Sequence, residues 1–167
     1  MLERLNDAVD YVHEIVKDEG PFDAVFGFSE GASVAAAYLQ AYSSEMQDNL
    51  VIAFAVFVCA AVVPPGLTSK NDEEEATLGP LLVSRGLAVP SVHIIGMKDL
   101  CFPQSEELLK SCKGNGSNTD AALRCSQPGF VQSVYFLGGH EVPIYPAAVG
   151  EMRIVIENAA RVAFSSR

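Results

Sequence analysis

Short apolar runs that alternate with helical patterns are the feature that most limits how this chain can fold. The longest run, "LVIAFAVFVCAAVV" at residues 50–63, is too short to cross a bilayer and is rich in β-branched and aromatic side chains, so it predicts a buried strand. Similar runs predict strands at residues 23–28, 91–96 and 130–137. Strands that are apolar along their whole length are typical of a parallel sheet with helices on both faces.

Helical patterns fill the segments between these strands. Apolar side chains recur at helical spacing in the first segment, where a Gly-Pro pair ends the pattern. Helices are predicted at residues 2–19, 30–46, 103–112 and 147–164. The alternating order predicts an α/β fold with about four parallel strands. Because no internal repeat or linker divides the chain, we expect a single domain over residues 1–167.

The charge of the chain limits its partners. It carries 21 acidic and 11 basic side chains, a formal net charge of -10, and no basic cluster. Nucleic acid and anionic membranes are poor partners for such a surface. Met1 leads directly into a charged helical pattern, so we expect no signal peptide and a cytoplasmic location. The acidic run at residues 72–75 is interpreted as a solvated loop or helix start.

The four cysteines show no CxxC pair and no histidine at zinc-ligand spacing, so no metal site is predicted. Cys59, Cys101, Cys112 and Cys125 are interpreted as structural or incidental thiols. Cys112 and Cys125 flank a Gly/Asn/Ser stretch and could pair if oxidised, but nothing in the sequence requires it.

Residues 27–31, Gly-Phe-Ser-Glu-Gly, form a G-x-S-x-G pattern between a predicted strand and a predicted helix. A serine at such a turn is held in a strained backbone conformation, and we expect the glycines on both sides of it to let strand and helix approach closely where a β-carbon would clash. The helix that follows directs its N-H groups toward the site, so the backbone N-H of Glu30 is a candidate oxyanion donor. A phosphate-binding turn is the alternative, but the pattern lacks the second glycine of G-x-G-x-x-G and any Walker lysine.

A serine nucleophile needs a base, and the chain holds three histidines. His13 lies on the first predicted helix and His93 within a predicted strand, whereas His140 follows the last strand on a glycine-rich loop. Loops at the carboxyl ends of parallel strands converge on one rim, so we expect Ser29 and His140 to meet there. Each residue alone could instead be a turn or capping residue.

The third member should be an acid that orients the base. The aspartates between Ser29 and His140 are Asp48, Asp72, Asp99 and Asp120. Only Asp99 lies just past the end of a predicted strand. The resulting order of serine, aspartate and histidine is that of the α/β-hydrolases.

Three segments, "GPFDAVFGFSEGA", "PSVHIIGMKDLCFPQSEELLKSC" and "FLGGHEVP", resemble the FSH-type serine hydrolases, an α/β-hydrolase family common in fungi. The resemblance runs from about Leu5 to the C-terminus. It implies Ser29 as nucleophile, Asp99 as acid and His140 as base, with the backbone N-H of Glu30, where the family usually has glutamine, in the oxyanion hole. Some fungal members are esterases or thioesterases of polyketide biosynthesis.

The resemblance also implies a reaction and its requirements. We expect hydrolysis of carboxylic ester or thioester bonds in a small-molecule or carrier-bound acyl substrate, with no metal or organic cofactor. Residues 113–129 either form a plain surface loop or shape the acyl pocket. An acyl-binding or partner-binding protein with impaired catalysis is the alternative function.

The segment that opens this chain normally follows earlier strands in the family, together with a His-Gly loop that supplies a second oxyanion donor. None of that pattern is seen before residue 24. We therefore expect the strand at residues 24–28 to be an exposed apolar edge, and activity to be weak or to depend on a partner or second copy that covers this edge.

Overall fold

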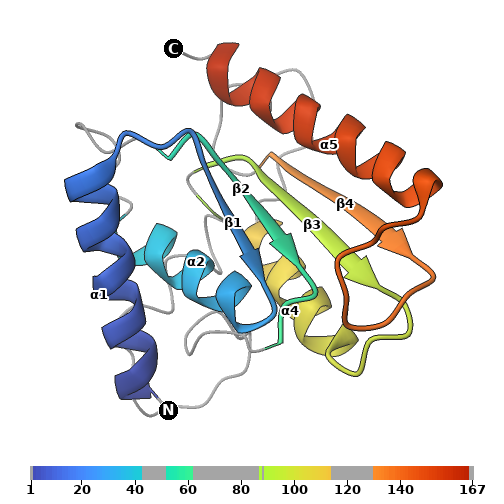
Figure 1. The fold of residues 1–167 in the computed structure, drawn as a ribbon, viewed down its shortest axis with the longest axis horizontal. Coiled ribbons are helices and arrows are strands. Elements are labelled where there is room, and N and C mark those ends of the chain that lie inside the picture. The colour runs from blue at the N-terminus through green and yellow to red at the C-terminus, as the bar shows by residue number, and fades with distance from the viewer. Residues whose placement is uncertain (1, 43–51, 62–86, 88, 114–129, 166–167) are drawn as a thin grey trace.

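A parallel sheet forms the centre of the protein in the computed structural model, which describes residues 2–42, 52–61, 87, 89–113 and 130–165 (Figure 1). The described part holds a four-stranded sheet in the order β1-β2-β3-β4, with every neighbouring pair parallel. Its elements, in chain order, are α1 (Leu2–Glu19), β1 (Ala24–Phe28), α2 (Glu30–Ala41), β2 (Phe54–Val58), β3 (Ser91–Gly96), α4 (Phe102–Lys113), β4 (Val131–Phe136) and α5 (Pro146–Ser165). The predicted α/β class and parallel sheet are confirmed.

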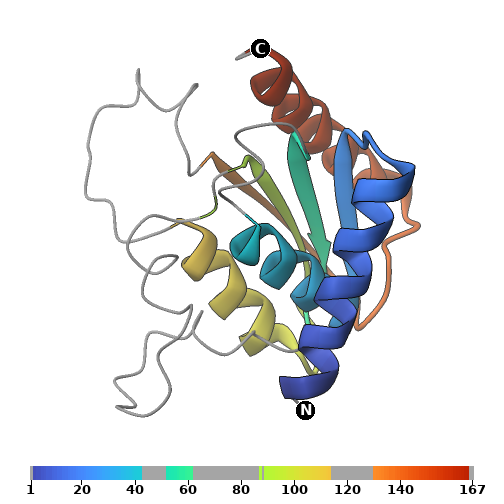
Figure 2. The ribbon, with the colours of Figure 1, turned by 90° about the vertical axis from the view of Figure 1, so that its left-hand side faces the viewer.

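Helices cover both faces of the sheet, so side chains that alternate along each strand enter two separate cores (Figure 2). On one face, Ala55 and Phe57 of β2 pack among residues of α1, α2 and α4. On the other face, Val56 and Val58 pack against α5. Burial on both sides explains why this strand is continuously apolar in sequence.

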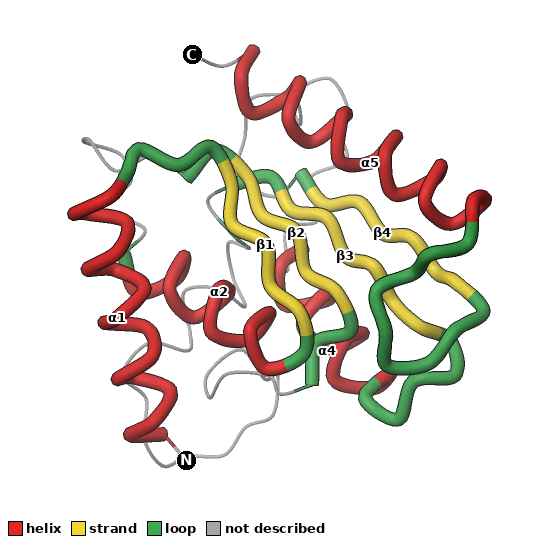
Figure 3. Tube along the Cα trace, in the orientation of Figure 1, coloured by secondary structure: helices red, strands yellow, loops and turns green. Residues whose placement is uncertain are grey.

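All four strands run in the same direction, and the segments that follow their carboxyl ends gather at one edge of the sheet (Figure 3). β2 is shorter than the predicted run, because it ends at Val58 and Cys59 turns away with a φ of 47°. The ends of the predicted strand at 50–63 and helix at 30–46 lie partly outside the described residues. The acidic run at 72–75, the segment 114–129 and Cys125 lie wholly outside the described residues.

β1 is an edge strand of the described sheet, because β2 is its only hydrogen-bonded neighbour there. Phe26 and Phe28 of β1 are 56% and 37% exposed. The expectation of an apolar edge at residues 24–28 is therefore confirmed in the described part of the chain.

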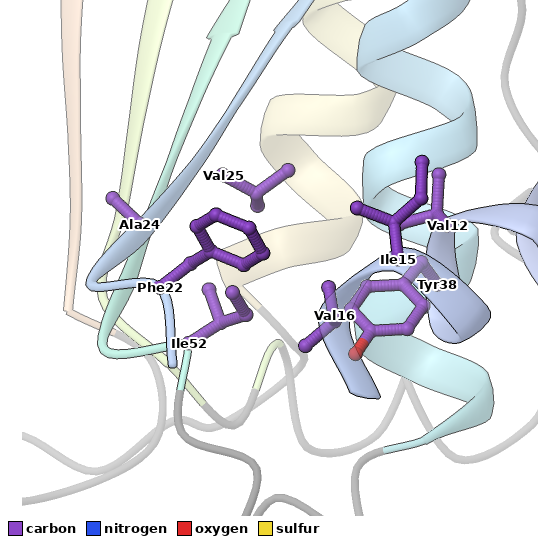
Figure 4. A pocket seen from close by; sticks show the side chains of 8 residues that line it. All are labelled: Val12, Ile15, Val16, Phe22, Ala24, Val25, Tyr38 and Ile52. Atoms are coloured by element: carbon purple, nitrogen blue, oxygen red, sulfur yellow. The ribbon is translucent and has the colours of Figure 1, made fainter. Parts of the chain in front are cut away.

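An apolar cavity of about 150 Å³ separates α1 from the start of the sheet (Figure 4). Side chains of α1, of α2 and of the segments around β1 and β2 line it: Val12, Ile15, Val16, Phe22, Ala24, Val25, Tyr38 and Ile52. Within the described residues, no helix combines the length and apolarity needed to cross a membrane.

Candidate active site

Ser29 occupies the sharp turn between β1 and α2, with φ 57° and ψ -126°. Such a conformation is strained for a residue with a side chain and is found at functional sites. The turn is tight because Gly27 has no side chain: a Cβ there would lie 2.5 Å from the Cα of Ala32. The same expectation of close approach is wrong for Gly31, because a Cβ at that position would meet nothing within 4 Å. The backbone N-H of Ser29 donates to the Val58 carbonyl at 3.0 Å, which fixes the turn to the end of β2. The serine is thus presented at the carboxyl edge of the sheet.

His140 and Asp99 meet Ser29 at this edge. The Oγ of Ser29 lies 2.7 Å from Nε2 of His140. On the other side of the ring, Nδ1 of His140 lies 3.0 Å and 2.9 Å from the two carboxylate oxygens of Asp99. A proton on Nδ1 is therefore held by the carboxylate, which leaves Nε2 to accept from the serine hydroxyl. The structure brings together the three residues that the sequence singled out.

The carboxylate of Asp99 is buried, with none of its side chain exposed, whereas 35% of the His140 side chain is exposed. Burial by itself would raise the pKa of Asp99, but hydrogen bonds from the Cys101 N-H and from His140, together with the nearby Cys59 thiol, hold that pKa below its usual value. The Cys101 N-H donates to Oδ1 at 2.8 Å. Asp99 is therefore an ionised, anchored partner for the imidazole.

The loops that carry the acid and the base are bound to each other directly. The N-H of Lys98 donates to the Gly138 carbonyl at 2.9 Å. Lys98 is the residue before Asp99, and Gly138 lies two residues before His140. Gly96 allows this approach, because a Cβ at that position would lie 2.3 Å from the Gly139 carbonyl oxygen. The close packing of the two loops sets the separation of the acid and the base.

Glu30 is the first residue of α2, so its backbone N-H has no partner within the helical hydrogen-bond ladder. It follows Ser29 directly, at the positive end of a 12-residue helix. An oxygen that gains negative charge beside Ser29 would be stabilised by this N-H and by the helix dipole. The predicted oxyanion donor therefore has a suitable position in the chain and on the helix.

The other histidines take no part in the site. His13 lies on α1 and stacks on Tyr42, with ring centroids 3.8 Å apart. His93 lies within β3 and is buried, as expected for a packed histidine. The competing aspartates, Asp48, Asp72 and Asp120, lie outside the described residues.

One residue at the site was missed by sequence reasoning. Cys59 follows β2, and its Sγ, a carboxylate oxygen of Asp99 and a ring nitrogen of His140 all lie within 4.8 Å of one another. These atom types can bind a metal ion, but both ring nitrogens of His140 already contact Ser29 and Asp99. The available signal was the position of Cys59 within the predicted strand at residues 50–63, the next strand along the chain after the nucleophile strand.

The chain is similar in sequence to known serine hydrolases and esterases. Residues 1–149 match the family described as "Serine hydrolase (FSH1)". The chain is 37% identical over 110 residues to "Esterase FPY3" of Fusarium mangiferae, with 63% of this chain and 47% of the relative covered. It is 28% identical over 138 residues to "Esterase FUS5" of Gibberella fujikuroi, with 83% and 47% covered. The chain thus spans about half the length of these curated relatives.

Solved structures support the fold. An esterase structure from a study of "two fungal esterases from Rhizomucor miehei" is similar with a TM-score of 0.58 at 13% identity, over 95% of this chain and 58% of that one. "Paleococcus ferrophilus monoacylglycerol lipase" is similar with a TM-score of 0.57 at 15% identity, over 95% of this chain and 76% of that one. Because the family match extends over most of the chain and includes all three residues of the site, the protein belongs to the FSH1 serine hydrolase family.

Proposed function

We propose that the protein is a serine hydrolase that cleaves carboxylic ester or thioester bonds, with Ser29 as nucleophile, His140 as base and Asp99 as acid. The observation that carries the proposal is the unbroken series of contacts from the Asp99 carboxylate through the imidazole of His140 to the Ser29 hydroxyl, with separations of 2.9 Å and 2.7 Å. These separations lie within the range over which a base activates a nucleophile.

The geometry supports a two-step reaction. His140 Nε2 takes the proton of Ser29 as Oγ attacks the acyl carbon, and Asp99 stabilises the imidazolium that forms. The oxygen of the tetrahedral intermediate would be stabilised by the N-H of Glu30. His140 then protonates the leaving alcohol or thiol, and the acyl group stays on Ser29. In the second step His140 activates a water molecule, which releases the acid and restores the serine.

Apolar side chains on the segments that carry the site support an acyl substrate. Phe28 precedes the nucleophile and packs against His140, with ring centroids 5.2 Å apart. Met97 and Leu100, beside the acid, are 53% and 96% exposed, and Ile144, which follows the base, is 80% exposed. Such a surface favours an apolar acyl group over a charged one. The family resemblance adds a narrower proposal, that the substrate is an ester or carrier-bound thioester of a fungal polyketide pathway.

The edge of β1 supports a proposal about partners. β1 has a hydrogen-bonded neighbour on one side only within the described sheet, and Phe26 on this strand is 56% exposed. We propose that a further strand, from a longer chain, a second copy or a partner, pairs with this edge and supplies another oxyanion donor. Addition of such a partner should raise the turnover number by about 10²–10³, the usual contribution of one donor.

The test is labelling with a fluorophosphonate probe, which reacts with activated serines. Wild-type protein should be labelled and Ser29→Ala should not. Ser165→Ala is the matched control, because Ser165 is an exposed serine at the far end of α5, and it should be labelled like wild type. Hydrolysis of p-nitrophenyl esters and of acyl N-acetylcysteamine thioesters would then separate the two substrate classes.

Folded wild-type protein without Ser29-dependent labelling would contradict the enzyme proposal for this chain. The alternative would then be a hydrolase-like protein that binds an acyl ligand or a partner without turnover. Binding of a fatty acid or acyl thioester, measured by calorimetry, would test that alternative directly.

A further inference from the structure

Cys59 is the residue next to the site that the proposed reaction does not use. It follows β2 directly, is 1% exposed, and has a φ of 47°. Its N-H donates to the Ile94 carbonyl at 2.9 Å, so its backbone is fixed against β3. A left-handed backbone of this kind is unfavourable for a residue with a side chain, and glycine adopts it without strain. The presence of cysteine at a position that favours glycine suggests that the thiol itself has a role.

The thiol contacts the chain on both sides of the base. Sγ lies 3.6 Å from the carbonyl oxygen of Gly139 and 3.5 Å from that of Glu141, the two neighbours of His140. These distances suit S-H donation to an oxygen acceptor. The contact joins the end of β2 to the loop after β4, two segments that are 80 residues or more apart in sequence.

The same sulfur lies beside the acid. Sγ and a carboxylate oxygen of Asp99 lie within 4.8 Å of each other, and the nearby Cys59 side chain contributes to lowering the pKa of Asp99. Burial raises the pKa of the Cys59 thiol, so the sulfur keeps its proton and acts as a donor, not as a nucleophile or thiolate ligand. The S-H group therefore lies within hydrogen-bond distance of the two carbonyl oxygens that flank the base, and close to the carboxylate of the acid.

We propose that Cys59 is a positioning residue, whose S-H group anchors the His140 loop beside the Asp99 carboxylate so that Nε2 of His140 stays in reach of Ser29. The proposal rests on the serine hydrolase function proposed above. The other explanation is that Cys59 only fills space, in which case any small side chain would serve. The two explanations differ for serine, which keeps a hydrogen-bond donor that alanine lacks, while glycine shows whether relief of the backbone strain can make up for the lost thiol.

The activity test compares three substitutions. Cys59→Ala and Cys59→Gly should lower kcat by about 10- to 100-fold with KM unchanged, as expected when a group that orients a catalytic side chain is lost. Cys59→Ser should recover activity to within a few fold, because its hydroxyl can donate to the same oxygens. Cys112→Ala is the matched control: Cys112 is a fully buried thiol in the opposite core, so this variant should keep the wild-type kcat.

A second readout does not require turnover. In ¹⁵N-labelled protein, the Nδ1-H proton of His140 should move or broaden in Cys59→Gly and stay unchanged in Cys112→Ala. Wild-type kcat in Cys59→Gly, a Cys59→Ser variant no better than Cys59→Ala, or an unchanged His140 resonance would overturn the proposal. If the wild type shows no Ser29-dependent labelling, the proposed function fails and the resonance alone decides the role of Cys59.

Discussion

His93 should make the fold sensitive to mild acid. The imidazole is fully buried in β3, packs near Phe57 with ring centroids 5.1 Å apart, and has Nε2 3.3 Å from the Oγ of Ser91. Burial, with a smaller contribution from the like charge of Lys113, lowers the pKa of His93 from 6.5 to about 3. The folded protein therefore holds this side chain neutral at a pH where the unfolded chain protonates it.

The sign and size of the effect follow from this difference in pKa. Because the folded-state pKa lies below the unfolded-state value, the contribution of His93 to the free energy of unfolding is complete above pH 6.5 and is lost as the pH falls toward 3. One pKa unit corresponds to about 1.4 kcal/mol, so the full loss is about 5 kcal/mol, and about 2 kcal/mol of it has occurred at pH 5. That is a large part of the stability of a typical domain.

The assay is urea unfolding of wild type and His93→Gln at pH 8 and pH 5, followed by circular dichroism. The variant is expected to be less stable at pH 8, since it disturbs a packed position. The informative quantity is the loss of unfolding free energy between the two pH values, which should be about 2 kcal/mol greater in wild type. Equal losses in the two proteins would refute the reasoning and mean that His93 is protonated in the fold.

Three further substitutions and one control, Gly31→Ala, test how the site is built. Asp99→Asn should lower kcat by about 10⁴ with KM little changed, because the amide favours the wrong histidine tautomer; a loss below tenfold in steady-state kinetics would argue against the acid role. Gly27→Ala should lower the free energy of unfolding, measured in urea, by more than about 2 kcal/mol, since its Cβ would lie 2.5 Å from the backbone of α2. Gly31→Ala should lower it by less than about 1 kcal/mol, because a Cβ there has nothing within 4 Å. Gly96→Ala should displace the base loop, because its Cβ would lie 2.3 Å from the Gly139 oxygen. Steady-state kinetics should therefore show a clear loss of kcat, and thermal unfolding a comparatively small change in melting temperature.

Much of the fold could be predicted from sequence because each element carries its own periodicity. The helix predicted at residues 2–19 coincides with α1, and the strand at residues 91–96 coincides with β3. Both depend on patterns that are visible locally, namely an amphipathic repeat and a short apolar run between breakers. The meeting of Ser29, Asp99 and His140 followed from one topological rule, that the carboxyl ends of parallel strands share an edge.

The part that could not be predicted depends on backbone conformation and on contacts between distant segments. Residues 54–63 stay apolar until the Pro-Pro-Gly sequence, so no glycine or polar residue marks the end of β2 at Val58. No local pattern marks the positive φ of Cys59, and its sulfur lies near Gly139 and Glu141 because β2 pairs with β3 and β3 with β4. Patterns of neighbouring residues in the sequence cannot predict such contacts.

The order of the strands in space is also their order along the chain, and the segment after each strand supplies one part of the site. Ser29 follows β1, Cys59 follows β2, Asp99 follows β3 and His140 follows β4. β4 is an edge strand of the described sheet, and only Val134 and Phe136 within it are fully buried. If β4 separated locally from β3, His140 would move away from the site, while Ser29 and the helices α1 and α2 would stay in place. On heating, catalytic activity should therefore be lost at a lower temperature than the helical circular dichroism signal. Activity then reports the opening of β4, which the helix content does not.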